Sequence, residues 1–116
     1  MIHMVSSFDL KPGEDFAQVA RLYDAFLADL LASDLIVDGG PLGRRVHNTP
    51  MDTDTLRTQQ VFSVIRFRDR AQLDAAYDSF VGGHPVGRTS HLEVHRRITN
   101  AAFLCWQDDE REDPAP

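Results

Sequence analysis

The sequence predicts an α+β fold with the element order βαββαβ and one antiparallel sheet. Segments 1–10 and 61–67 carry apolar residues at every second position, as strands do, whereas segments 14–33 and 69–81 follow the 3.6-residue period of amphipathic helices. The length of 116 residues allows one domain with one hydrophobic core. We therefore expect a single domain over residues 1–107, followed by an acidic, disordered tail over residues 108–116.

The first half of the chain predicts strand, helix and a bent strand. Residues 1–10 form a strand with one strongly apolar side, and a Lys-Pro-Gly sequence ends it. Residues 14–33 carry an unbroken apolar stripe with acidic residues in the first turn, which predicts a long helix. A second strand begins at residue 35 and resumes through residue 47, interrupted by glycines and a proline that make it bent or an edge strand. Residues 48–58 predict a long polar connection.

The segment 59–83 joins a strand directly to a helix. Both sides of this strand are apolar, with Val61, Ile65 and Phe67 on one side and Phe62 and Val64 on the other. Asp69 stands where a helix N-cap is expected, and Gly82 stands where a glycine ends a helix. This unit is therefore predicted to run as strand, helix and stop without a loop between the first two.

The segment after Gly83 allows two interpretations. Ser90 and Glu93 have the spacing of a capping box, which predicts a short third helix. The alternative is a strand with His91, Glu93 and His95 on one face, and the periodicity does not decide between the two. Residues 101–107 are apolar on both sides and predict the last strand.

These elements fit the ferredoxin-like arrangement. Two βαβ halves with right-handed crossovers give a four-stranded antiparallel sheet in the order 4-1-3-2, with the first and third strands at the centre. If His3 lies opposite Arg66, then Ile2 meets Phe67, and this face collects the apolar side chains that the helices can cover.

The opposite face of the predicted sheet is also apolar. It carries Val5, Phe62 and Val64, together with apolar residues of the last strand, and a monomer would leave them in water. A second sheet from another copy of the chain should cover this face, which predicts a homodimer.

The element order, the sheet with two apolar faces and the run His84-Pro85, followed by His91 and Val94, resemble the dimeric α/β-barrel superfamily. The likeness covers residues 1–107 and is nearest in pattern to the stress-responsive A/B-barrel, EthD-like and small antibiotic-biosynthesis monooxygenase proteins. It implies that two sheets close a barrel in a homodimer, with pockets inside the barrel or between each sheet and its helices. Members range from cofactor-independent oxygenases to proteins of no known activity, so the resemblance does not fix the function.

Two polar residues on the sheet face that the partner would cover are candidate catalytic groups. His3 and Arg66 are adjacent in the expected register, and a neutral imidazole held beside an arginine can accept a proton from an acidic phenol or enol. The alternative is structural: Arg66 bridges to a carboxylate across the dimer, and His3 is hydrogen-bonded near the strand start. Gln60, Phe62 and Trp106 are the candidate residues of a ligand pocket.

Three histidines are candidate metal ligands. His91 and His95 share a helix face at a spacing of four, and His84 is close enough in sequence to approach them. The alternative is that they are solvent-facing or capping histidines.

Composition excludes several function classes. A formal net charge of −6 argues against a nucleic-acid partner, and no apolar run approaches the ~20 residues that span a membrane. The N-terminus lacks the pattern of a signal peptide, so we expect a cytoplasmic protein. Cys105 lies in an apolar run and is expected to be a buried, small hydrophobic residue.

The sequence thus predicts a homodimeric α/β-barrel protein that has no bound cofactor. Its pocket would take a small apolar or aromatic ligand, in a binding or interaction role. The alternative is a cofactor-independent, monooxygenase-like enzyme that acts on a small aromatic or polyketide-like substrate.

Overall fold

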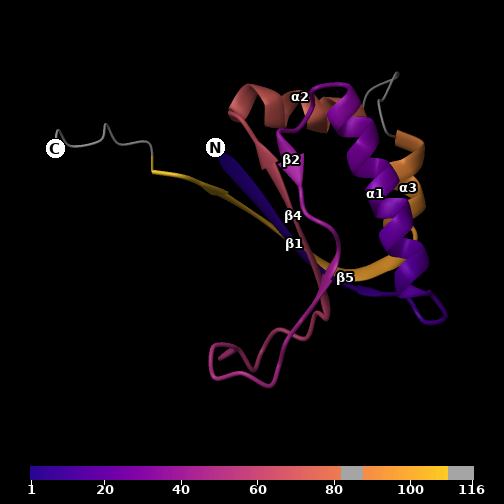
Figure 1. Ribbon diagram of the computed structural model, residues 1–116, viewed down its shortest axis with the longest axis vertical. Coiled ribbons are helices and arrows are strands. Elements are labelled where there is room, and N and C mark those ends of the chain that lie inside the picture. Colours follow the sequence, from indigo (N-terminus) through magenta and orange to yellow (C-terminus); the bar gives the residue numbers. More distant parts are fainter. Residues whose placement is uncertain (82–87, 110–116) are drawn as a thin grey trace, which may run out of the picture.

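The structure is a computed structural model that describes residues 1–81 and 88–109. This part of the chain forms one antiparallel sheet of five strands with three helices gathered on one side of it (Figure 1). In chain order the elements are β1 (Ile2–Leu10), α1 (Phe16–Ala32), β2 (Asp38–Gly39), β3 (Gly43–Arg44), β4 (Val61–Phe67), α2 (Arg70–Val81), α3 (Arg88–His95) and β5 (Ile98–Gln107). The α+β class and the short third helix predicted from the sequence are confirmed. None of the described helices combines the length and the apolar character that a membrane span requires.

The sheet has five strands where the sequence predicted four. Its order is β2-β4-β1-β5, and the short β3 also pairs with β4. The segment predicted as the second strand is divided, because only Asp38–Gly39 and Gly43–Arg44 pair with β4. Pro41 lies between these pieces and has no backbone N–H to donate to a ladder.

The register between β1 and β4 is the one predicted from the sequence. His3 lies opposite Arg66, and Ile2 lies opposite Phe67. The side of the sheet that faces the helices holds the buried residues of both strands, namely Ile2, Ser6, Phe8, Val61, Ser63, Ile65 and Phe67. The apolar side chains among them form one core with the apolar stripe of α1.

The opposite side of the sheet, called the outer face below, is defined by Val5, Phe62, Val64, Leu104 and Trp106. Val5 lies opposite both Val64 and Leu104, so the three side chains share one face. Phe62, Leu104 and Trp106 are 44%, 54% and 60% exposed.

Cys105 is exposed as well, so its predicted burial was wrong. It belongs to β5, an edge strand whose last nine residues, 99–107, are all exposed.

The helix ends correct some predicted boundaries. Asp69 caps α2 as predicted, because its side chain accepts a hydrogen bond of 2.9 Å from the backbone N–H of Gln72. Ser90 was predicted to cap α3, but it lies inside this helix and its hydroxyl donates to Asp29 at 2.7 Å. The predicted helix stop at Gly82 lies outside the described residues.

Candidate functional site

A small cavity of about 60 Å³ lies between the sheet and the helices. We call it the helix-side cavity and define it by its polar lining residues, which are Ser6, Tyr23, Ser63, His91 and His95. Its remaining walls are apolar and include side chains of β1, β4, α3 and β5. Cavities with apolar walls and a few convergent polar groups are the usual form of small-molecule sites.

Tyr23 supplies the most unusual group of this cavity. It belongs to the buried stripe of α1 and is 4% exposed, and its hydroxyl makes no hydrogen bond of ordinary geometry with the described residues. Burial raises the pKa of Tyr23 to about 12, and the neighbouring hydroxyl of Ser63 opposes this shift only in part. The phenol therefore stays protonated at neutral pH and is available as a hydrogen-bond donor.

Two serines bring further hydroxyl groups to the same region. Ser6 of β1 and Ser63 of β4 are Cα partners on the helix side of the sheet, and they are 4% and 1% exposed. Serine is mostly an exposed residue, and a fully buried serine hydroxyl usually makes a hydrogen bond. Together with Tyr23 these residues form a hydroxyl-lined wall inside an otherwise apolar core.

His91 lies on α3 at another wall of the cavity. Its ring stacks on Phe80 with a centroid distance of 4.6 Å and an interplanar angle of 9°, and it also contacts Phe26 and His95 at 5.3 Å and 5.6 Å. Burial, and to a smaller extent the nearby His95, lowers the pKa of His91. The imidazole is therefore neutral at neutral pH and can accept a proton.

The cavity thus combines a protonated phenol with a neutral imidazole. Tyr23 comes from α1 and His91 comes from α3, two helices that pack directly against each other. The imidazole can accept a proton, whereas the phenol, whose raised pKa makes it a weak acid, can donate a hydrogen bond.

Sequence reasoning found His91 but assigned it to a metal, and it missed Tyr23, Ser6 and Ser63. Tyr23 was missed because it lies on the apolar stripe of a helix, where an aromatic residue is expected to pack in the core. Ser63 did carry a signal, since it is a polar residue between apolar neighbours on the buried side of a strand. Such a residue needs a hydrogen-bond partner, which a packed core alone does not provide.

The predicted metal ligands are only partly described. His91 and His95 lie side by side on α3, with ring centroids 5.6 Å apart, whereas His84 lies outside the described residues. Within residues 1–81 and 88–109 no group of three potential metal ligands comes together. A metal site that includes His84 stays a prediction.

The structure brings His3 and Arg66 together on the outer side of the sheet, but gives each its own carboxylate. The Nε2 atom of His3 lies 2.9 Å from Oδ1 of Asp108, and Nε of Arg66 donates to Oδ1 of Asp38 at 2.5 Å. Asp38 also raises the pKa of Arg66. Arg66 thus already pairs with a carboxylate of its own chain, that of Asp38, whereas the structural alternative drawn from the sequence placed a carboxylate across the dimer. A catalytic role of this pair stays a prediction.

In the single chain the three predicted pocket residues line different hollows, and a pocket that they share in a closed barrel stays a prediction. Gln60 and Phe62 line a hollow of about 350 Å³ beside the loop that precedes β4. Trp106 lines another of about 430 Å³, which it shares with Ile2 and Cys105.

No protein-family model matches the sequence, and no curated protein is significantly similar to it. Solved structures do match. The Arabidopsis thaliana protein At3g17210 is 8% identical, with a TM-score of 0.73 over 97% of this chain and 99% of that chain. Hydroxynitrile lyase from Passiflora edulis is 12% identical, with a TM-score of 0.66 over 97% and 96% of the two chains. A dimeric ferredoxin-like protein of unknown function from Thermobifida fusca is 13% identical, with a TM-score of 0.60 over 90% and 88%.

Other similar structures are an antibiotic biosynthesis monooxygenase and an EthD family protein, with TM-scores of 0.59 and 0.54. These matches show that the chain has a ferredoxin-like fold. At such low identity they show the fold alone.

Proposed function

Because the chain has the fold of dimeric ferredoxin-like proteins, we propose that it forms a homodimer in which two sheets close a barrel. The support is the outer face, where Phe62, Leu104 and Trp106 stay about half exposed in a single chain. Large aromatic and aliphatic side chains gathered on one sheet face are typical of an interface. The proposed barrel is built from four strand positions of each copy, in the predicted order 4-1-3-2, with β2 and β3 sharing one position.

We further propose that the helix-side cavity binds a small, largely apolar or aromatic molecule that carries a hydrogen-bond acceptor. The observation that carries this proposal is the buried hydroxyl of Tyr23, which has no hydrogen-bond partner of ordinary geometry among the described residues. A buried donor without a partner costs about 1–3 kcal/mol, so its retention requires an explanation. A carbonyl or hydroxyl oxygen of a ligand would satisfy it.

The size and walls of the cavity limit the ligand further. At about 60 Å³ the cavity has room for about two water molecules, so an aromatic ligand binds only if the walls rearrange. His95 and Phe103 are exposed residues of its lining, so a larger ligand would enter by displacing their side chains. The aromatic rings of Phe8, Tyr23 and Phe103 in the cavity lining favour a flat ligand.

An enzymatic role is the second candidate, and it has two possible locations. In the cavity, neutral His91 would act as a base, and Tyr23 would donate a hydrogen bond to the bound molecule. On the outer face, His3 and Arg66 would serve a monooxygenase-like reaction on a small aromatic or polyketide-like substrate, as the predicted alternative requires. The fold shared with an antibiotic biosynthesis monooxygenase supports the second location by analogy alone.

Binding of acetophenone, a flat aromatic ketone that does not ionise, tests the proposal. Titration followed by NMR should give a dissociation constant that rises about tenfold in Tyr23→Phe, because one buried hydrogen bond is lost. His3→Ala serves as the control on the other side of the sheet and should bind as the wild type does. Equal binding by wild type and Tyr23→Phe would refute the cavity assignment, and loss of binding in His3→Ala alone would favour the outer face.

A further inference from the structure

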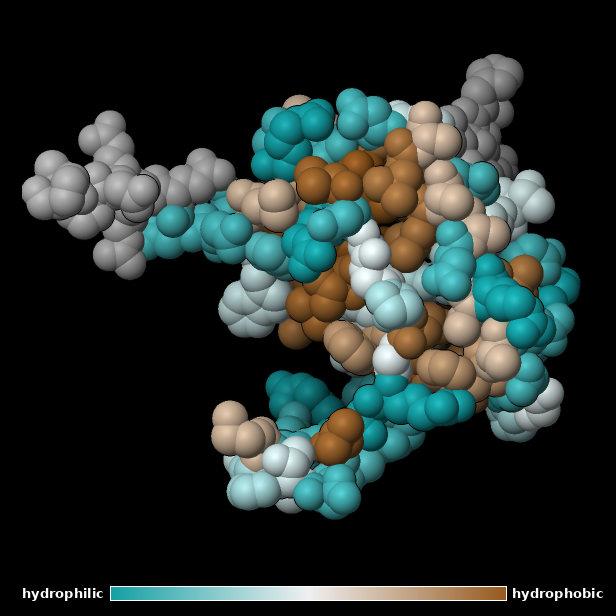
Figure 2. Space-filling model, viewed as in Figure 1, coloured by the Kyte–Doolittle hydropathy of each residue, from teal (hydrophilic) through white to brown (hydrophobic). Residues whose placement is uncertain are grey.

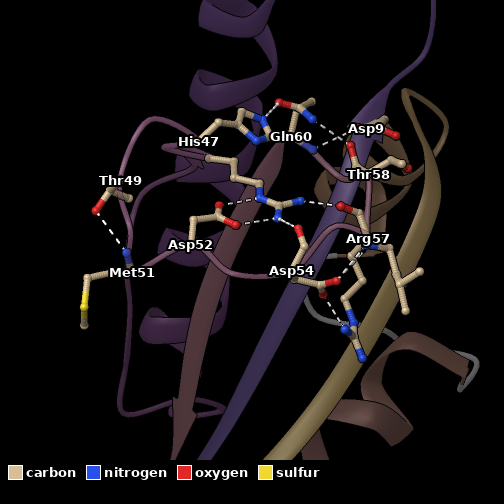
Figure 3. A network of polar contacts seen from close by, with 11 residues as sticks. Asp9, His47, Thr49, Met51, Asp52, Asp54, Arg57, Thr58 and Gln60 are labelled. Atoms are coloured by element: carbon tan, nitrogen blue, oxygen red, sulfur yellow. Dashed lines mark hydrogen bonds and ion pairs between the residues drawn. The ribbon is translucent and has the colours of Figure 1, made fainter.

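Residues 45–60 form a long loop that connects β3 to β4, and we call it the arm. It extends well beyond the end of the sheet, away from the helices (Figure 1). The sequence predicted only a polar connection over most of this segment. The structure instead gives the arm a defined internal network (Figure 3).

Arg45 holds the arm together from inside. Its Nε and Nη2 atoms donate to the two carboxylate oxygens of Asp52, each at 2.7 Å, and Nη2 also donates to the backbone carbonyl of Asp54 at 2.8 Å. Nη1 donates to the carbonyl of Arg57 (Figure 3). The side chains of Arg45 and Asp52 are only 17% and 16% exposed. A bidentate pair of this kind fixes geometry as well as charge.

The base of the arm is tied to the central strand β1 and to the edge strand β5. The backbone N–H of Gln60 donates to Asp9 at 2.9 Å, and the side chain of Asn100 donates to the other oxygen of Asp9 at 3.1 Å. His47 and Gln60 also pair across the base at 2.7 Å. Gln59 of the arm donates to the backbone carbonyl of Asn100 at 3.1 Å, so the arm is joined to β5 as well as to β1 and has a fixed direction relative to the sheet.

The arm carries apolar side chains that the rest of this chain does not cover. Val46, Met51 and Leu56 are 61%, 89% and 84% exposed. Its charges are largely neutralised within the arm, because Arg45 pairs with Asp52 and Arg57 pairs with Asp54. A rigid segment that neutralises its own charges and exposes apolar tips has the properties of a docking element.

The arm is continuous with the outer face. The hollow of about 350 Å³ is lined by Val46, Asp54 and Arg57 on the arm and by Ser7 and Phe62 on the sheet. Figure 2 shows the arm standing apart from the main body, with an open space between them. Whatever covers the outer face therefore meets the arm as well.

We propose that the arm docks on a second copy of this chain and that the partner fills the hollow between the arm and the outer face. This inference rests on the proposed sheet-face dimer. A standard interface buries roughly 800 Å² per partner, and three large apolar side chains that are about half exposed, those of Phe62, Leu104 and Trp106, provide less than that. The arm is the adjoining apolar surface that enlarges this interface, and the fold is shared with a protein described as dimeric.

The test compares three variants by sedimentation equilibrium, with circular dichroism as the check on folding. Met51→Glu/Leu56→Glu places two charges on the arm, whereas Leu31→Glu/Leu92→Glu places the same two charges on helix positions that are each 49% exposed. Leu104→Glu places one charge on the outer face. We expect the dimer dissociation constant to rise at least tenfold in the arm variant and in Leu104→Glu, and to stay unchanged in the helix variant.

The outcomes separate the two proposals. If Leu104→Glu dissociates the dimer and the arm variant does not, the docking role of the arm is refuted while the sheet-face dimer stands. If the wild type is itself a monomer at a concentration of about 100 μM, both proposals fail. If the helix variant dissociates as readily as the arm variant, the effect is one of net charge and the arm assignment is wrong.

Discussion

Replacing Tyr23 by phenylalanine should stabilise the free protein. The substitution removes one hydroxyl that is buried and without a hydrogen bond of ordinary geometry in the described residues, and it leaves the ring, which contacts Phe26 at a centroid distance of 6.1 Å. A buried unsatisfied polar group costs about 1–3 kcal/mol, so we expect the unfolding free energy to rise by about 1 kcal/mol. For a domain of this size that gain corresponds to a rise in Tm of about 4 °C.

Urea denaturation followed by circular dichroism measures this effect. Tyr77→Phe is the matched control, because Tyr77 is 62% exposed and the same change there should alter the unfolding free energy by less than about 0.5 kcal/mol. A loss of about 1 kcal/mol in Tyr23→Phe would mean that the hydroxyl is a structural hydrogen-bonding group, satisfied by Ser63. The reason for assigning it to a ligand would then disappear.

The remaining predictions concern His91 and the arm. The pKa of His91 is lowered by burial and by His95, so the unfolded chain binds a proton at this residue more readily than the folded chain does. The unfolding free energy should therefore fall as the pH drops below about 6.5. His91→Phe keeps an aromatic ring at this position, and its urea midpoint should change less between pH 7 and pH 5. A wild-type midpoint no more sensitive to pH than that of His91→Phe would contradict this. Arg45→Met should speed amide hydrogen exchange at Asp52 and Leu56, because the arm loses its internal tie, whereas Arg70→Met breaks only an exposed pair on α2 and should leave these amides unchanged. Equal exchange in both variants would show that Arg45 does not hold the arm.

The strand register was predictable because it depends on side-chain alternation alone. A slip of one residue between β1 and β4 would move Ile2 and Phe67 from the core to the outer face, so the apolar pattern permits one pairing. The cap at Asp69 was predictable for a similar reason, since it depends on a residue type at one position relative to its own helix.

The features that sequence reasoning missed depend on contacts between distant segments. Cys105 has the neighbours of a core residue in sequence, but β5 lies at the sheet edge and its side chain is exposed. The tie between Arg45 and Asp52 looks in sequence like ordinary surface charges. The helix-side cavity requires that Tyr23, Ser63 and His91 meet from α1, β4 and α3, and no local pattern encodes their meeting.

We propose the helix-side cavity as a small-molecule site in which the Tyr23 hydroxyl is the hydrogen-bond donor. The most direct measurement is a crystal structure of the protein soaked with acetophenone. We expect density for the probe in the helix-side cavity beside His91, with its carbonyl oxygen within hydrogen-bond distance of the Tyr23 hydroxyl. An empty cavity with the probe bound beside His3 and Arg66 on the outer face would contradict it.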